Sequence, residues 1–311
     1  MTDIVLHHYP TSPFAELARV ALGLKGLAWT SVEIPMMMPK PDLVELTGGY
    51  GRTPVLQIGA DIYCDTAAIL DALERHTPSP SFYPPPLGEL HRMIAGWAGA
   101  AQFGAHVGAA FKNAPQDTLP PGFVEDRKRR FVGFDFAAMP ALAPHLETQV
   151  LASVAWIDAI LADGRAFIGG EAAGHGDLAL YANLWFLKII PSAADFAAQA
   201  LAAPRVAAWH DRVAAIGHGA PRAGSAEDAI RLARASAPSD PVGSIKGLAA
   251  GQPVMIRTEQ SGDDPVAGAL LRCDEGGITV RRSSHRAGDL NVHFPRIGQI
   301  VILARAAGTV G

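Results

Sequence analysis

The strand-to-helix turn near the N-terminus holds the first residues that could do chemistry. Thr11, Ser12 and Pro13 follow a short apolar strand at residues 4–6 and open a segment in which apolar residues recur at helical spacing. A helix N-terminus stabilises an anion, because it presents unpaired N–H groups and the positive end of the helix dipole. A hydroxyl at this position can donate to a thiolate. Ser12 before Pro13 is equally an ordinary helix start, with Ser as the N-cap.

Two further segments carry side chains or backbone that could bind a peptide-like ligand. Arg52, Thr53 and Pro54 precede a predicted hairpin. A cis bond before Pro54 would turn the backbone of Thr53 outward to pair with an extended peptide, although strand entry is the commoner role of such a proline. Asp65 and Thr66 open the next predicted helix, where they can cap it or complement its dipole.

The elements around these residues predict an α/β domain over residues 1–84. A strand at 4–6, a helix from residue 13 and a strand at 28–34 are followed by a hairpin and a helix at 65–76. This βαβ and then ββα order suits a mixed sheet with helices on both faces.

The rest of the chain divides at residues 238–241, where a Pro-rich linker begins. Residues 85–238 predict an all-helical bundle uninterrupted by strands, with helices at 87–112, 124–136, 143–162, 176–189, 203–216 and 225–236. Residues 239–311 predict a small β-barrel-like module with strands at 254–258, 266–273, 278–282, 290–294 and 300–303.

Composition favours a small-molecule or protein partner. The 311 residues carry a formal net charge of -4 with both signs interspersed, which argues against nucleic acid or a polybasic membrane surface as a partner. The two cysteines lie in apolar runs without disulfide or zinc spacing, so we expect free thiols, no metal and a reducing cytoplasm. We expect neither a signal peptide nor a membrane span.

The order of the motifs resembles the N-terminal domain of glutathione transferases. That order is strand, Ser-Pro-Phe, helix, Gly-x-Thr-Pro-Val-Leu, hairpin, and then Asp-Thr at a helix start. Residues 166–170 (AFIGG) and 176–180 (GDLAL) look like the core segment of the family's helical domain, so the resemblance covers about the first 235 residues. It implies a thioredoxin-like glutathione-binding domain, then a helical-bundle domain.

The resemblance also implies roles for residues. Ser12 would be the catalytic hydroxyl that hydrogen-bonds the glutathione sulfur, with Thr11 as the adjacent rival. The other implied contacts are the Thr53 backbone before a cis Pro54 for the cysteinyl unit, Asp65 and Thr66 for the γ-glutamyl end, Phe14 and Arg52 flanking the tripeptide, and Phe103 and Phe111 at the substrate pocket.

The implied activity is attack of an activated glutathione thiolate on a small hydrophobic electrophile, with glutathione as co-substrate, in a homodimer. The alternatives are a non-catalytic scaffold with the same fold, or a glutathione-dependent isomerase, dehalogenase or ether-cleaving lyase. We expect the β module to dock on the helical domain or at a dimer interface.

One position departs from the family pattern. Three residues before Asp177 the family has Ser or Thr, whereas this chain has Gly174, so the side-chain half of a capping box is missing. Asp177 can still cap, and we expect His175 to help.

Overall fold

The computed structural model describes residues 3–112, 114, 119–131, 135–241, 243–245, 247–259 and 261–304. Its N-terminal part has the predicted βαβ and then ββα order. The elements are β1 (Ile4–His8), α1 (Pro13–Leu24), β2 (Ala28–Glu33), α2 (Pro41–Thr47), β3 (Val55–Ile58), β4 (Asp61–Cys64) and α3 (Thr66–His76).

The second part is helical, as predicted. Its α-helices are α4 (Leu90–Trp97), α5 (Phe103–Phe111), α6 (Phe123–Arg130), α7 (Met139–Ile160), α8 (His175–Ile189), α9 (Ala194–Ala200) and α10 (Pro204–Ala214). A π-helical turn, η1 (Ala98–Gln102), joins α4 to α5, and short 3₁₀ turns occupy Phe136–Ala138, Leu161–Asp163 and Pro191–Ala193. Residues 132–134 of the predicted helix 124–136 lie outside the described residues.

The expectation that no strand interrupts residues 85–238 is wrong at one place. A short strand, β5 (Ala220–Ala223), pairs in parallel with β2, and α11 (Ala226–Ala235) follows it. All four residues of β5 are exposed, so no apolar alternation marks the strand in the sequence. The chain thus returns to the N-terminal sheet before the third part begins.

The predicted β module is present. Its strands are β6 (Pro253–Thr258), β7 (Val266–Asp274), β8 (Gly277–Ser284), β9 (Gly288–Phe294) and β10 (Gln299–Leu303). Strands β6 to β9 form an antiparallel meander, and β10 pairs antiparallel with β6. Because β9 pairs with β4, the described strands make one ten-stranded sheet in the order β10-β6-β7-β8-β9-β4-β3-β1-β2-β5. The module therefore extends the N-terminal sheet instead of closing on itself.

The pairing of β4 with β9 is parallel and is fixed by a buried carboxylate. Asp61 on β4 is 6% exposed and accepts hydrogen bonds from His293 Nε2 at 2.8 Å, Asn291 Nδ2 at 3.2 Å and the Ser239 hydroxyl at 2.9 Å. Burial by itself raises the pKa of Asp61, but the bonds from His293 and Ser239 outweigh it and hold that pKa below its ordinary value. Tyr63 stacks on the His293 ring at 4.4 Å.

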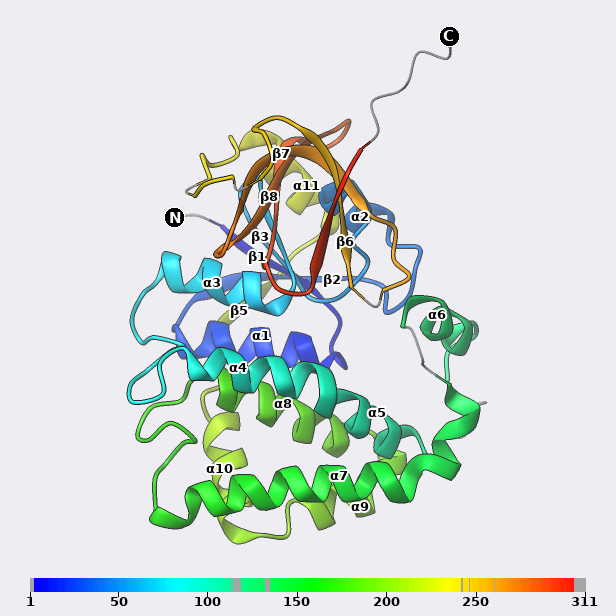
Figure 1. Cartoon of the computed structure of the whole chain (residues 1–311), viewed down its shortest axis with the longest axis vertical. Helices are drawn as coiled ribbons and strands as arrows, with labels where there is room; N and C mark the ends of the chain where they lie inside the picture. The colour runs from blue at the N-terminus through cyan, green and yellow to red at the C-terminus, as the bar shows by residue number, and fades with distance from the viewer. Residues whose placement is uncertain are drawn as a thin grey trace.

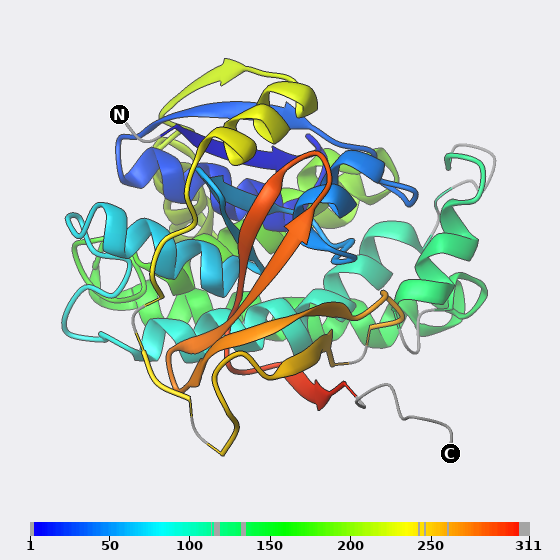
Figure 2. The same ribbon diagram turned by 90° about the horizontal axis from the view of Figure 1, so that it is seen from above.

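The sheet separates two layers of helices (Figures 1 and 2). Helices α1 and α3 lie between the sheet and the helical part of the chain, whereas α2 and α11 cover the other face. One hydrophobic cluster joins α1 and α3 to the helical part, and a second joins α2 and α11 to the module strands. The second includes the free thiols of Cys64 and Cys273, as predicted. The module shares its core with the N-terminal part.

The N-terminus of α8 is capped without a side chain at position 174, where the sequence has glycine in place of the expected Ser or Thr. Asp177 caps the helix by accepting from Gly174 N at 3.0 Å and also from Ile168 N at 2.8 Å. His91 on α4 fills the space beside Gly174, and its Nδ1 accepts from Gly176 N at 3.3 Å. His91 thus replaces the missing hydroxyl. The expected helper, His175, is buried, and its Nδ1 has no hydrogen-bond partner among the described residues.

Replacing this cap in two steps gives a testable prediction. Gly174→Ser should destabilise the fold by about 2 kcal/mol, because an added Cβ would lie 2.4 Å from the His91 ring. His91→Ala should cost about 1 kcal/mol or more, through loss of the cap and a cavity.

The double variant Gly174→Ser/His91→Ala should cost at least 1 kcal/mol less than the sum, since a serine hydroxyl can then cap α8. Urea unfolding of the four proteins measures this coupling. Additive free energies would show that His91 does not stand in for the hydroxyl.

Candidate active site

Ser12 is the N-cap of α1. Its Oγ accepts from the N–H of Ala15 at 3.2 Å, and Pro13 takes the first helical position. Ser12 is 2% exposed, whereas Thr11 beside it is exposed. The ordinary capping role is therefore confirmed. Capping uses a lone pair of the Ser12 oxygen, so the hydroxyl hydrogen can still be donated to another acceptor.

The segment before β3 is anchored by a lysine. The Thr53–Pro54 bond is cis, as the resemblance implied. Lys40 Nζ donates to Thr53 Oγ1 and to the Gly51 carbonyl, both at 2.9 Å, and Lys40 is 1% exposed. Burial, assisted by the charges of Arg130 and Arg127, lowers the pKa of Lys40 to about 7.

Sequence reasoning missed Lys40. Its signal was a lone cation between two prolines, at a position where most of the neighbouring side chains are apolar. The lysine also lies 5.8 Å from the ring centroid of Tyr9, so it connects the cis-proline segment to the turn that leads to Ser12.

Asp65 has an unusual backbone. Among the described residues it is the one non-glycine residue with a positive φ, at 82°. It caps α3, which begins at Thr66, through Oδ1, which accepts from Ala67 N at 2.9 Å. Burial raises the pKa of Asp65, while the Ala67 hydrogen bond and the charge of Arg52 act in the opposite direction. Such backbone outliers cluster at ligand sites.

Arg52 lies at the boundary between the N-terminal part and the β module. Its Nε is 3.8 Å from Asp263 Oδ2, and its guanidinium is 5.6 Å from the ring centroid of Phe131. The Nε has no hydrogen-bond partner among the described residues. The guanidinium is therefore close to an acid of the module and still able to take a further acceptor.

The aromatic residues expected at a substrate pocket belong to one connected set of rings. Phe14 and Phe103 are in contact, with ring centroids 4.7 Å apart, beside the π-helical turn η1. Phe111 contacts Phe123, Phe136 and Phe186, and the Phe186 ring also lies 6.3 Å from Phe103. Phe103 thus contacts Phe14 directly, whereas Phe111 is connected to Phe103 through Phe186. π-Helical turns are frequent at functional sites.

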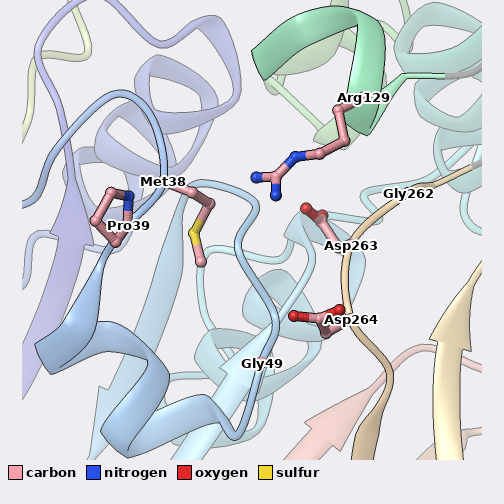
Figure 3. Close-up of a pocket in the computed structure, with 7 residues that line it drawn as sticks. All are labelled: Met38, Pro39, Gly49, Arg129, Gly262, Asp263 and Asp264. Carbon is pink, nitrogen blue, oxygen red and sulfur yellow. The ribbon is translucent and has the colours of Figure 1, made fainter. Parts of the chain in front are cut away.

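A cavity of about 290 Å³ opens where the three parts of the chain meet. Met38, Pro39 and Gly49 line one side, and Arg129 with the module residues 262–264 lines the other (Figure 3). The side chain of Arg129 projects from α6 toward Asp263. Neither this cavity nor the pairing of Arg52 was foreseen, because both depend on the module's position.

Two models of known protein domains match segments of the chain. Models of the glutathione S-transferase N-terminal and C-terminal domains match residues 6–81 and 137–212. A GST-like protein from Pseudomonas syringae of known structure is 36% identical, with a TM-score of 0.79 over 98% of this chain and 100% of that chain. The chain belongs to the glutathione S-transferase family. Since the match with the Pseudomonas syringae protein covers 98% of this chain, it includes the β module.

More distant structures share the transferase fold alone. A glutathione S-transferase from Methylobacterium radiotolerans, in complex with glutathione sulfonate, is 21% identical with a TM-score of 0.51 over 71% of this chain and 97% of that chain. Beta-etherase LigF from a Sphingobium species is 16% identical, with a TM-score of 0.53 over 69% of this chain and 96% of that chain. No curated protein matches the chain. Within the described residues, no helix has the length and apolarity to cross a membrane.

The low pKa of Lys40 predicts how stability changes with pH. Since the folded pKa is about 7 and the ordinary value is 10.5, the unfolded chain binds more protons between these values, so stability should rise with pH. Relative to Lys40→Met, which does not titrate, the wild-type transferase should gain about 3 kcal/mol between pH 7 and pH 9.5.

Urea unfolding at the two pH values measures the gain, with the exposed Lys128→Met as the matched control. A constant difference between wild type and Lys40→Met would mean that Lys40 keeps its ordinary pKa.

Proposed function

We propose that this transferase binds glutathione, holds it as a thiolate through Ser12, and directs it to a small hydrophobic electrophile. The observation that carries the proposal is the buried Ser12 hydroxyl at the N-terminus of α1, with its hydrogen free for donation. Thr11 is the weaker candidate because its side chain is exposed.

The energy of one such hydrogen bond is sufficient for the task. A free thiol titrates near 8.5, and a charge-assisted hydrogen bond contributes about 1.5–3 kcal/mol, which is about one to two pKa units. The N-terminus of α1 adds to this stabilisation. Thiolate is then the main form of bound glutathione near neutral pH, and it attacks the electrophilic carbon while the protein supplies proximity.

The remaining proposed contacts are arranged as an extended peptide requires. The Thr53 backbone before the cis Pro54 would pair with the cysteinyl unit. The N-terminus of α3, with Asp65 and Thr66, would hold the γ-glutamyl end. Arg52 and Phe14 would flank the tripeptide. The Methylobacterium structure, which holds glutathione sulfonate, supports such a site in a protein of this fold.

The electrophile would enter beside Phe14 and Phe103, near the turn η1. Ether cleavage, isomerisation and dehalogenation use the same thiolate and stay as alternative reactions. Because the fold is similar to that of a beta-etherase, the compounds to be assayed should include ethers. A non-catalytic binding role is the other alternative, and the thiolate experiment separates it from an enzyme.

Ultraviolet titration of bound glutathione tests the role of Ser12. The wild-type complex should show thiolate absorbance near pH 7, and Ser12→Ala should raise the pKa of the thiol by about one to two units. Conjugating activity at pH 6.5 should fall by about 10- to 100-fold. Ser12→Thr keeps the hydroxyl and the cap, and Thr11→Val is the matched control at the neighbouring hydroxyl.

Because Ser12 also caps α1, Ser12→Ala should cost about 1 kcal/mol of stability, which unfolding measures separately. An unchanged thiol pKa in Ser12→Ala would remove Ser12 from the mechanism. Thiolate absorbance without turnover of any electrophile would favour the non-catalytic role.

We further propose that the transferase is a homodimer through an apolar patch on α4 and α7. Leu90 and Met93 on α4 are 51% and 71% exposed, and Trp156 and Ile160 on α7 are 59% and 39% exposed. Trp156 stacks on Trp97, the last residue of α4, with ring centroids 5.6 Å apart, so the two helices are in contact at this pair of rings. Exposed apolar patches of this kind mark protein interfaces.

Trp156→Glu should weaken this dimer. A central tryptophan typically contributes about 2 kcal/mol or more to an interface, so the Kd for dimer dissociation should rise about 30-fold. Sedimentation velocity over a concentration series measures the change. Leu142→Glu is the control, since Leu142 is 49% exposed near the other end of α7. A monomeric wild type, or equal effects of both variants, would contradict the patch as the interface.

A further inference from the structure

The loop between β6 and β7 docks on α6 and on the segment before the cis proline. Gly262 N donates to the Arg130 carbonyl at 3.0 Å, and Ser261 forms an antiparallel bridge with Phe131. A Cβ on Gly262 would lie 1.9 Å from the Arg129 carbonyl, so only glycine allows this approach. Figure 3 shows the loop facing α6 and the segment of Met38.

Asp263 is the residue of this loop that contacts the arginines of the junction. Its Oδ1 accepts from Arg130 Nε at 2.8 Å, and its Oδ2 lies 3.8 Å from Arg52 Nε. The Ser261 hydroxyl donates to the same carboxylate at 3.1 Å. A Cβ on Gly51 would be 3.3 Å from Asp263 Oδ1, so the carboxylate also lies directly against the backbone before Arg52.

The junction has more basic than acidic side chains among its described residues. The basic ones are Lys40, Arg52, Arg127, Arg129 and Arg130, and the acidic ones are Asp126, Asp263 and Asp264. Asp126 is in contact with Arg127, while Asp263 lies between Arg52 and Arg130. Asp263 is thus the acid that keeps those two guanidinium groups together. Burial is the main cause of the lowered pKa of Lys40, and the charges of Arg130 and Arg127 lower it further.

We propose that Asp263 is a positioning residue of the glutathione site, through which the β module holds Arg52 and the backbone of residues 51–53 in the geometry that receives the tripeptide. This inference rests on the proposed function. Asp263 does not touch the reacting sulfur. It acts through Arg52, and the excess positive charge that remains is free to receive a carboxylate of the ligand.

The Asp263→Asn variant removes the charge and keeps the shape of the side chain. Arg130 keeps Asp126 at 3.8 Å, but Arg52 loses the acid beside it, is repelled by Arg130 and turns toward solvent. The Kd for glutathione should rise about tenfold by isothermal titration calorimetry, and the KM for glutathione should rise in parallel. The kcat at saturating glutathione should stay unchanged, because Ser12 lies on another segment.

The matched control is Glu259→Gln, which removes a charge from an exposed residue of the same loop that does not line the cavity. It should leave the Kd for glutathione unchanged. Asp263→Glu keeps the charge and should bind more tightly than Asp263→Asn. In a cycle with Arg52→Met, the effect of Asp263→Asn should disappear, because Asp263 acts through Arg52.

Each outcome decides the matter. A Kd of Asp263→Asn equal to that of wild type and Glu259→Gln overturns the inference and leaves the proposed function intact. Equal losses of kcat and affinity, or additive effects with Arg52→Met, also overturn it, since they indicate general damage. A wild type that does not bind glutathione overturns both.

If Asp263→Asn does not fold by circular dichroism, Ser261→Ala provides the second variant. It removes one donor to the Asp263 carboxylate and should raise the Kd roughly twofold. An unchanged Kd in Ser261→Ala would then count against the inference.

Discussion

The parallel pairing of β4 with β9, fixed by Asp61, is the interaction on which the arrangement of this transferase depends. Asp61 is buried at the edge of the N-terminal sheet and would be costly there without partners, since an unpaired buried charge is unfavourable. Its partners, His293, Asn291 and Ser239, all come from the last quarter of the chain. An otherwise open sheet edge is covered, and the module gains a fixed orientation.

From that orientation the other long-range contacts follow. The module strands share a core with α2 and α11, so the β6–β7 loop is held at a set distance from the cis-proline segment. The loop meets α6, and α6 in turn contacts the segment before α2, where Asp126 accepts from Met38 N at 3.3 Å. Three parts of the chain therefore meet beside Arg52, although they are far apart in sequence.

Most of the elements, although not the exposed strand β5, and the family could be predicted from the sequence because they depend on local patterns. Ser12 before Pro13 predicts a helix start, and short apolar runs separated by glycine-containing turns predict the five module strands. Lys40 and Asp263 could not be predicted as neighbours of the site, since their contacts depend on tertiary position. His91 is a similar case: no local rule connects it to Gly174, which lies 83 positions later. The predicted domain boundaries and site roles stay predictions.

Helix capping and thiolate stabilisation are compatible roles for Ser12, because they use different atoms of one hydroxyl. Capping requires a lone pair on Oγ, which Ala15 N–H engages at 3.2 Å. Thiolate stabilisation requires the hydrogen, which a capping bond leaves free. The cap also fixes the direction of the hydroxyl, since Oγ must face the first turn of α1. A sulfur anion needs a donor that is already positioned. The helix cap positions the Ser12 oxygen and leaves its hydrogen free to donate, so the ordinary helix start supports the proposed chemistry.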